Sequence, residues 1–272
     1  MTSAQEWTLQ SAKGGKRHVR EWPNPKATWI ALLAHGYGEH IGRYGHVADA
    51  LHAAGAAVFG PDHEGHGRSA GQQALIADFE AVIDDLHAVA LRAVEKYPGR
   101  PMVLIGHSMG GMIAARYGQR FGRELAALVL SGPMFGTREV LSLLQTMDPI
   151  PEIPQDPAAL SRDPAVGQAY AADPLVWHGA FKRTMLKAMI AAMEAAEAGP
   201  ALGDLPTFWI HGEADPLVPL EATRPMMAHL RGTRFQEKFY PGAKHEVFNE
   251  TNRDEVIGDV LAFISKTLAQ AA

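Results

Sequence analysis

Gly106-His107-Ser108-Met109-Gly110-Gly111 stands between an apolar run, Met102–Ile105, and a stretch with helical spacing that begins at Met109. The segment matches the pattern G-x-S-x-G in the context of a strand, a sharp turn and a helix. Small residues beside Ser108 let such a turn hold the serine in a strained backbone conformation, with its hydroxyl clear of the sheet edge. The sequence therefore predicts a nucleophilic serine at the end of a buried strand.

The rest of the chain alternates short apolar runs with longer helical patterns. Several of the short runs are almost continuous Val, Ile and Leu, which indicates strands covered on both faces. Strands are expected at Ala27–Ala34, Ala57–Pro61, Met102–His107, Ala126–Ser131, Thr207–His211 and Arg234–Tyr240. Helices are expected at Tyr44–Ala54, Asp78–Tyr97, Met109–Phe121, Leu220–Leu230 and Asp254–Leu268. This alternation predicts an α/β fold with a mainly parallel sheet flanked by helices, and Gly14-Gly15 is expected to turn an N-terminal antiparallel hairpin.

The alternation stops between Pro133 and Gly203, where the sequence is rich in proline and shows helical patterns instead of strands. Strand and helix patterns resume at Leu205. We therefore expect one domain with a core formed by residues 1–132 and 204–272 and an inserted helical lid formed by residues 133–203.

Composition excludes several classes of protein. The chain has 272 residues, of which 47% are hydrophobic and 20% charged, as is ordinary for a globular domain. The net charge of −5 and the lack of a basic block give no electrostatic basis for binding nucleic acid. The absence of cysteine excludes disulfides, thiolate metal sites and a cysteine nucleophile. Met1–Trp22 lacks the apolar core of a signal peptide, which favours a cytoplasmic location.

A serine becomes a good nucleophile when a histidine lies within hydrogen-bond reach and a carboxylate orients that histidine. In folds with the G-x-S-x-G turn these partners follow in the order serine, acid, histidine. Asp215 comes just after the expected strand Thr207–His211, and His245 comes just after Arg234–Tyr240. We predict that Ser108, Asp215 and His245 form a catalytic triad, with Glu213 as the alternative acid.

Acyl transfer also needs two backbone N–H groups that hold the negative oxygen of the intermediate. One is expected from Met109, the residue after the nucleophile. The other is expected from Tyr37 in the loop His35-Gly36-Tyr37-Gly38, which follows the first central strand. The glycines allow this loop to turn tightly enough to aim the N–H group.

Two further features of the sequence could belong to a metal or cofactor site, but neither predicts one. Asp62-His63-Glu64-Gly65-His66-Gly67 contains possible metal ligands, but its spacing is not H-E-x-x-H and it follows a strand as a turn does. The glycine-rich segments contain neither a dinucleotide-binding pattern nor a P-loop. The sequence therefore predicts no metal and no cofactor.

Three segments together resemble the serine α/β-hydrolases of the monoacylglycerol lipase and lysophospholipase family. They are His35-Gly36-Tyr37-Gly38-Glu39-His40 with Arg43-Tyr44 following, Asp62 to Ser69, and Gly106 to Gly111. The resemblance covers about Trp29 to Leu268 except most of the lid. It implies an α/β-hydrolase fold and hydrolysis of a single-chain lipid ester, above all a monoacylglycerol. It also implies that Glu39 and Arg43 help to form a polar pocket for the glycerol end, and a structural ion pair is the alternative for these two residues.

Other functions stay open at this point. A broad-specificity carboxylesterase or a lysophospholipase would use the same triad, and a ligand-binding protein could keep the fold without catalysis. Apolar lid residues are compatible with transient contact with a membrane surface, and they include Phe135, Leu141, Leu144 and Ile150. The sequence indicates no oligomeric state.

Overall fold

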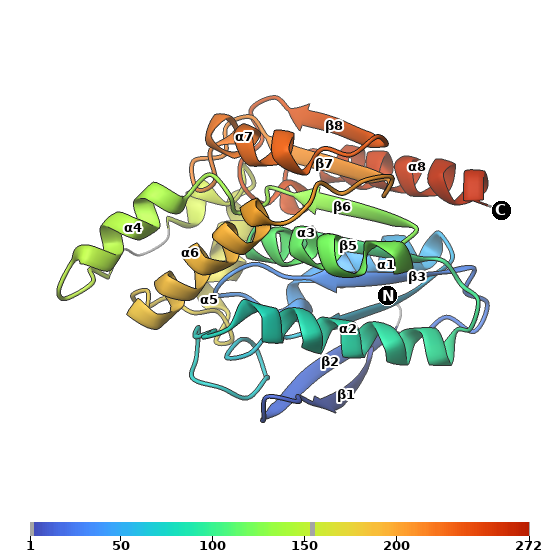
Figure 1. The fold of residues 1–272 in the computed structure, drawn as a ribbon, viewed down its shortest axis with the longest axis horizontal. Helices are drawn as coiled ribbons and strands as arrows, with labels where there is room; N and C mark the ends of the chain where they lie inside the picture. The colour runs from blue at the N-terminus through green and yellow to red at the C-terminus, as the bar shows by residue number, and fades with distance from the viewer. Residues whose placement is uncertain (1–2, 153–155, 272) are drawn as a thin grey trace.

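The computed structural model describes residues 3–152 and 156–271. Its centre is an eight-stranded sheet with the order β1-β2-β4-β3-β5-β6-β7-β8 (Figure 1). The strands are β1 (Gln5–Gln10), β2 (Lys16–Trp22), β3 (Trp29–Ala34), β4 (Ala56–Pro61), β5 (Met102–His107), β6 (Ala127–Ser131), β7 (Thr207–Gly212) and β8 (Phe235–Tyr240). Strands β3 to β8 are parallel, and β1 and β2 form the N-terminal antiparallel hairpin. The predicted α/β fold with a mainly parallel sheet is confirmed.

Differences from the predicted strands lie at their ends. β3 begins at Trp29 and not at Ala27, because the Ala27 N–H closes a turn on the Asn24 carbonyl oxygen at 2.9 Å. The helix predicted over Tyr44–Ala54 is α1 (Gly45–Ala53), and Tyr44 is instead the last residue of a 3₁₀ turn, Ile41–Tyr44. The expected helix α3 (Met109–Phe121) has the predicted bounds, and so has α7 (Leu220–Leu230).

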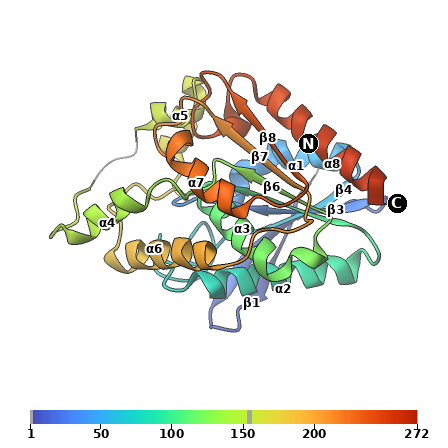
Figure 2. The same cartoon turned by 45° about the horizontal axis from the view of Figure 1, so that its top comes forward.

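Alternating side chains along the strands divide the core into two layers. In β3, Ile30 and Leu32 belong to one layer, whereas Ala31 and Leu33 belong to the other. The first layer is covered by α2 (Phe79–Lys96), α3 and α7, and the second by α1 and α8 (Arg253–Ala271), as Figure 2 shows. Because both faces are covered, every residue of β3 to β7 is buried, which explains the continuous apolar runs in the sequence.

Residues 133–203, named here the insertion, follow β6 at the carboxyl ends of the parallel strands. The insertion contains α4 (Arg138–Thr146), α5 (Pro164–Ala172) and α6 (Arg183–Ala198), and no strand occurs among those of its residues that the structure describes. Residues 153–155 of the predicted lid lie outside the described residues. α4 projects beyond the end of the sheet (Figure 1), and α6 packs between α4 and α3. The insertion therefore lies over the edge of the sheet where loops carry the candidate site.

Within the ranges described, none of the helices is both long enough and apolar enough to cross a bilayer.

Candidate active site

The turn between β5 and α3 holds Ser108 with φ +55° and ψ −118°. A residue with a side chain rarely adopts such a conformation, which costs about 1–3 kcal/mol. Backbone hydrogen bonds hold it in place: the Ser108 N–H donates to the Ser131 carbonyl oxygen at 2.9 Å, and the Ser108 carbonyl oxygen accepts from Met134 at 3.0 Å. The neighbouring strand β6 and the start of the insertion thus fix the position of the serine.

The glycines near Ser108 are required because α3 passes very close to the sheet. A Cβ atom on Gly106 would lie 2.2 Å from the Gly110 carbonyl oxygen, and one on Gly110 would lie 2.0 Å from the Ala34 carbonyl oxygen. Both distances are far below van der Waals contact. The G-x-S-x-G pattern is therefore explained by backbone packing of α3 against β5 and β3.

Asp215 and His245 meet across the loops that follow β7 and β8. His245 Nδ1 lies 2.7 Å from Asp215 Oδ2, and both side chains are buried. Asp215 Oδ1 accepts hydrogen bonds from the N–H groups of Leu217 and Val218, each at 2.9 Å. Asp215 and His245 are the acid and the base that the sequence predicted from their order along the chain. The alternative acid, Glu213, is exposed.

The charges of this pair stabilise each other. Burial opposes ionisation of Asp215, but the His245 charge and hydrogen bonds from His211 and His245 outweigh it and hold the pKa well below its usual range. Burial also opposes protonation of His245, but the charge and hydrogen bond of Asp215, together with the charges on Glu246 and Glu39, outweigh it and raise the pKa above 6.5. A histidine that accepts a proton becomes a positively charged imidazolium. The buried Asp215 carboxylate stabilises that charge on His245.

A second histidine, His211, supports Asp215 and was missed in the sequence. Its Nδ1 accepts a hydrogen bond from Trp209 Nε1–H at 3.2 Å, so its Nε2–H donates to the Val218 carbonyl oxygen at 2.8 Å. The same Nε2 lies 3.2 Å from Asp215 Oδ2. The signal was its place near the end of β7, four residues before Asp215, but it stands among 13 histidines in the chain.

Ser108 and His245 line the same cavity, which has a volume of about 380 Å³. No hydrogen bond joins the Ser108 hydroxyl to His245 in the described part of the chain, and such bonds are often long until substrate binds. His107, also missed in the sequence, lines the same cavity. Its ring centroid is 4.7 Å from that of His245, and burial lowers its pKa to about 4, so it is neutral at pH 7.

Of the two expected oxyanion donors, one lies in the cavity wall and the other directly follows Ser108. Tyr37 lines the cavity in the loop after β3, and Met109 is the first residue of α3. Within the described residues, no hydrogen bond uses the N–H of either residue. Both N–H groups are therefore available to a bound oxygen atom, as an oxyanion hole requires.

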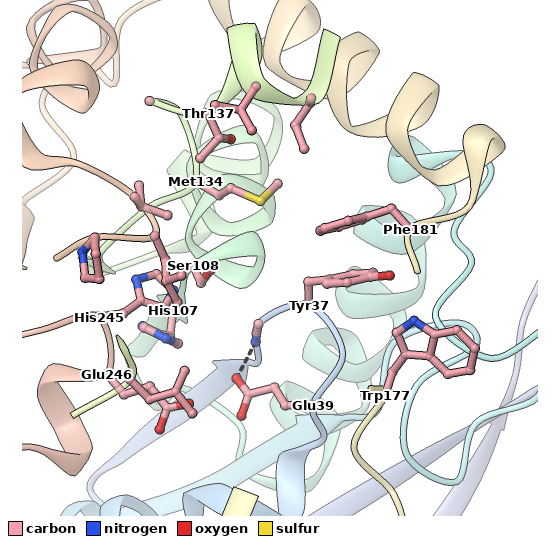
Figure 3. Close-up of a pocket in the computed structure, with 18 of the residues that line it drawn as sticks. Tyr37, Glu39, His107, Ser108, Met134, Thr137, Trp177, Phe181, His245 and Glu246 are labelled. Atoms are coloured by element: carbon pink, nitrogen blue, oxygen red, sulfur yellow. Dashed lines mark hydrogen bonds between the residues drawn. The ribbon is translucent and has the colours of Figure 1, made fainter. Parts of the chain in front are cut away.

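The cavity has an apolar end and a polar end, with Ser108 between them (Figure 3). Met134, Leu141, Leu144 and Phe181 line the apolar end, near α4 and the start of α6. The polar end is lined by Glu39, His107 and Glu246. A molecule with one apolar and one polar part fits this arrangement.

Glu39 and Arg43 belong to a buried ion-pair network beside the polar end. Arg43 Nη1 donates to Glu39 Oε2 at 2.6 Å and to Glu246 Oε1 at 2.7 Å, and Nη2 donates to Glu246 Oε2 at 2.7 Å. Glu39 Oε1 accepts from the Gly36 N–H and the Tyr44 hydroxyl, each at 2.7 Å. Glu39 thus lines the cavity and anchors the loop that carries Tyr37, whereas Arg43 lies behind the cavity wall.

Glu246 is a site residue that sequence reasoning missed. It follows His245 directly, lines the cavity and accepts from Arg43 and, at 2.7 Å, from Asn249 Nδ2. Its place next to the predicted base was the available signal.

The segment that begins at Asp62 organises loops. Asp62 Oδ1 accepts from the Ile41 N–H at 2.8 Å, and Oδ2 accepts from the Arg68 N–H at 2.9 Å. No group of three or more His, Asp or Glu side chains among the described residues is arranged to hold a metal ion.

The chain is similar to known proteins over nearly its whole length. A family model described as serine aminopeptidase, S33, matches residues 25–252, a range that contains Ser108, Asp215 and His245. A monoacylglycerol lipase of Mycolicibacterium smegmatis is 37% identical over 262 residues, which is 92% of this chain and 94% of that protein.

The chain belongs to this family of serine α/β-hydrolases.

Solved structures of similar proteins have the same fold. A thermostable carboxyl esterase of Bacillus coagulans in complex with glycerol is 27% identical, with a TM-score of 0.81 over 98% of this chain and 99% of that one. A soluble variant of monoglyceride lipase of Saccharomyces cerevisiae has a TM-score of 0.82 at 22% identity, over 98% of this chain and 96% of that one. The serine-hydrolase family resemblance noted in the sequence is confirmed.

Proposed function

We propose that the protein hydrolyses monoacylglycerols to a fatty acid and glycerol through a covalent acyl-enzyme. The observation that carries this proposal is the cavity itself, in which a strained serine and a paired histidine lie between an apolar and a polar end. Membership of the S33 family and 37% identity to a monoacylglycerol lipase support it.

In the proposed first step, Ser108 Oγ attacks the ester carbonyl carbon while His245 accepts the hydroxyl proton. The N–H groups of Tyr37 and Met109 hold the negative oxygen, and each contributes about 3 kcal/mol in the transition state. Asp215, hydrogen-bonded to His245 Nδ1 at 2.7 Å, fixes the ring and stabilises the imidazolium. His245 then protonates the departing glycerol oxygen, which leaves an acyl group on Ser108.

In the second step His245 removes a proton from a water molecule, which attacks the acyl carbonyl carbon. The tetrahedral intermediate collapses, His245 returns the proton to Ser108 Oγ, and the fatty acid leaves. The same five residues serve both steps, and the reaction as written requires no cofactor and no metal.

The insertion, residues 133–203, is proposed to act as the lid that binds the acyl chain. It supplies most of the apolar lining, including Leu141, Leu144 and Phe181. Val140 and Leu143 on α4 each expose 59% of their surface, which supports transient contact of α4 with a lipid surface. The catalytic core would then consist of residues 1–132 and 204–272.

A broad carboxylesterase or a lysophospholipase with the same triad is the alternative, since the catalytic groups do not decide the leaving alcohol. A panel of monoacylglycerols, lysophospholipids and short p-nitrophenyl esters separates these functions. We expect the highest kcat/KM for a monoacylglycerol.

The test of the mechanism is Ser108→Ala, which removes the attacking oxygen. Hydrolysis should fall by at least about a thousandfold, and a fluorophosphonate should label the parent but not the variant. Retention of activity within tenfold of the parent would contradict the mechanism. Lipid binding without turnover or labelling by the parent would instead indicate a ligand-binding protein. The cytoplasmic location expected from the sequence stays a prediction for cell fractionation to test.

A further inference from the structure

The polar end of the cavity contains two carboxylates but no cationic side chain that faces the substrate. Of the described residues that line the cavity, none is Lys or Arg. Glu39 and Glu246 both line it, and the Arg43 guanidinium that pairs with them lies behind the wall. Two carboxylates and one guanidinium leave a net charge of −1 at this end.

The side chains of Glu39, Glu246 and Arg43 are buried, and hydrogen bonds fix their positions. Their exposed fractions are 4%, 5% and 11%, in that order. Burial opposes ionisation of Glu39, but the charge on Arg43, the nearby histidines and the hydrogen bond from Tyr44 together outweigh it and lower the pKa to about 2. His107 does not offset the negative charge, because burial keeps it neutral at pH 7. In so buried a site an added charge is poorly screened by water and salt.

Each carboxylate retains room for a further hydrogen bond. A carboxylate has about four acceptor positions. Glu246 receives three donors, from the two Nη groups of Arg43 and from Asn249 Nδ2. Glu39 also receives three, from Gly36, Arg43 and Tyr44. The remaining acceptor positions suit hydroxyl groups, which donate hydrogen bonds, and repel a phosphate, which carries −1.5 to −2 charges near pH 7 and only accepts.

We propose that this carboxylate pair makes the leaving-group end of the site selective for uncharged polyol head groups and against phosphate-bearing ones, with Glu246 as the specificity-determining residue. The inference rests on the proposed function. It predicts that lysophospholipids are poor substrates, because their phosphate is repelled by the carboxylates, whatever the activity of the triad. Glu246 is the residue to change, because Glu39 also anchors the Gly36 N–H and its loss would disturb the oxyanion loop.

The test compares three lauroyl esters that differ in the charge of the alcohol: 1-lauroylglycerol, 1-lauroylglycerol 3-phosphate and lauroylcholine. For the parent we expect kcat/KM for the phosphate ester to be at least about 100-fold below that for the glycerol ester. Lauroylcholine has a bulky but cationic head group, and it should react faster than the phosphate ester. Equally poor reaction of the choline and phosphate esters would indicate exclusion by size and would overturn the proposal.

Glu246→Gln removes one negative charge and keeps the shape of the side chain. The ratio of kcat/KM for the glycerol ester to that for the phosphate ester should shrink at least about tenfold. The control Glu221→Gln makes the same change of charge on α7, where the side chain is 79% exposed, and should leave the ratio unchanged. An unchanged ratio in a Glu246→Gln protein that still reacts with a fluorophosphonate would overturn the proposal.

The rates of the parent protein with the three lauroyl esters test the proposal even if the Glu246→Gln variant does not fold. A parent that hydrolyses the glycerol and phosphate esters within threefold of each other contradicts this inference and leaves the proposed function intact. A parent that is labelled at Ser108 but hydrolyses none of the three esters contradicts the proposed function itself.

Discussion

The backbone N–H of Trp177 donates a hydrogen bond of 2.7 Å to the carbonyl oxygen of Gly38, and so fastens the insertion to the loop after β3. The side chains beside this bond add two further ties. Tyr37 stacks on Phe181 with ring centroids 4.6 Å apart, and His40 Nε2 lies 2.9 Å from Asp173 Oδ2. The loop that presents the Tyr37 N–H is therefore held from outside by the insertion and from inside by Glu39.

Phe181→Ala removes the stacked ring and should loosen the Tyr37 loop. A stacked aromatic pair contributes about 0.5–1.5 kcal/mol beyond its buried area, so we expect kcat to fall by up to about tenfold. Backbone hydrogen exchange in the segment 36–38 should become faster. Leu143→Ala is the control, since that side chain is in the same insertion but 59% exposed and outside the cavity lining. If both variants behave alike, the stack does not position the loop.

Asp215→Asn tests the choice of acid. The amide cannot hold His245 in the required tautomer or stabilise its charge, so kcat should fall by roughly 10³ to 10⁴. Glu213→Gln is the matched control, because Glu213 is two residues away and exposed. It should keep nearly full activity. A larger loss in the Glu213 variant than in the Asp215 variant would reverse the assignment.

The patterns that predicted the fold are local in the sequence, whereas one of the site residues that they missed depends on a distant partner. Burial on both faces appears directly as continuous apolar residues in β3 to β7, so those strands were found to within two residues. Likewise the triad candidates each follow a strand. The role of Glu246 gave no such signal, because it depends on Arg43, which is 203 positions away in the chain. His211 has local partners, including Trp209 and Asp215, but its position near the end of β7 did not distinguish it among 13 histidines.

The roles of the polar residues after β3 likewise could not be assigned from the sequence alone. The string that contains Glu39 and Arg43 was recognised, but the sequence could not decide between a substrate contact and an ion pair. The decision needs the distance to Glu246, which only the folded chain sets. Glu39 both lines the cavity and joins the ion pair, so the two interpretations are compatible for it.

The rate should depend on pH through His245, which must be neutral to accept a proton. Its pKa is raised above 6.5 in the folded protein by Asp215, against the effect of burial. Consequently kcat/KM should fall as the pH drops below that raised pKa. Other charged or titratable groups near His245 include Glu39 and Glu246, His107, whose ring centroid lies 4.7 Å from that of His245, and His211, which contacts Asp215. A profile that stays flat down to pH 4 would exclude a histidine base.

Gly110→Ala tests the contact between α3 and β3. The added methyl would lie 2.0 Å from the Ala34 carbonyl oxygen, so helix and strand must separate, at a cost of about 3 kcal/mol. Gly258→Ala in α8 is the control, since a Cβ there meets nothing within 4 Å. Alanine favours the helix, so this control should stabilise by roughly 0.5–1 kcal/mol. Urea unfolding of both variants measures the difference, and equal effects would contradict the packing argument.

A cluster of buried histidines should make the fold sensitive to acid. The ring of His35 lies 4.2 Å from that of His63 and 5.6 Å from that of His66, measured between centroids. Burial, followed by the charge on His35, lowers the pKa of His66 to about 3, and burial lowers that of His63 well below 6.5. Between pH 6.5 and about 3 the unfolded chain therefore binds a proton at His66 that the folded protein does not, and the lowered pKa of His63 acts in the same direction.

Since the unfolded state binds more protons in this window, the free energy of unfolding falls as the pH falls, by at most about 1.4 kcal/mol per pH unit for each histidine. His66→Gln removes one of these groups, and its amide can still donate to the Glu64 carbonyl oxygen that His66 Nδ1 contacts at 2.8 Å. The difference in urea midpoint between pH 7.5 and pH 5 should therefore be smaller in the variant than in the parent. His18 acts in the opposite direction, because Asp62 raises its pKa and its contribution is lost as the pH rises. The parent and the variant share that contribution, so a difference that stays unchanged in the variant would show that His66 is not a source of the acid sensitivity.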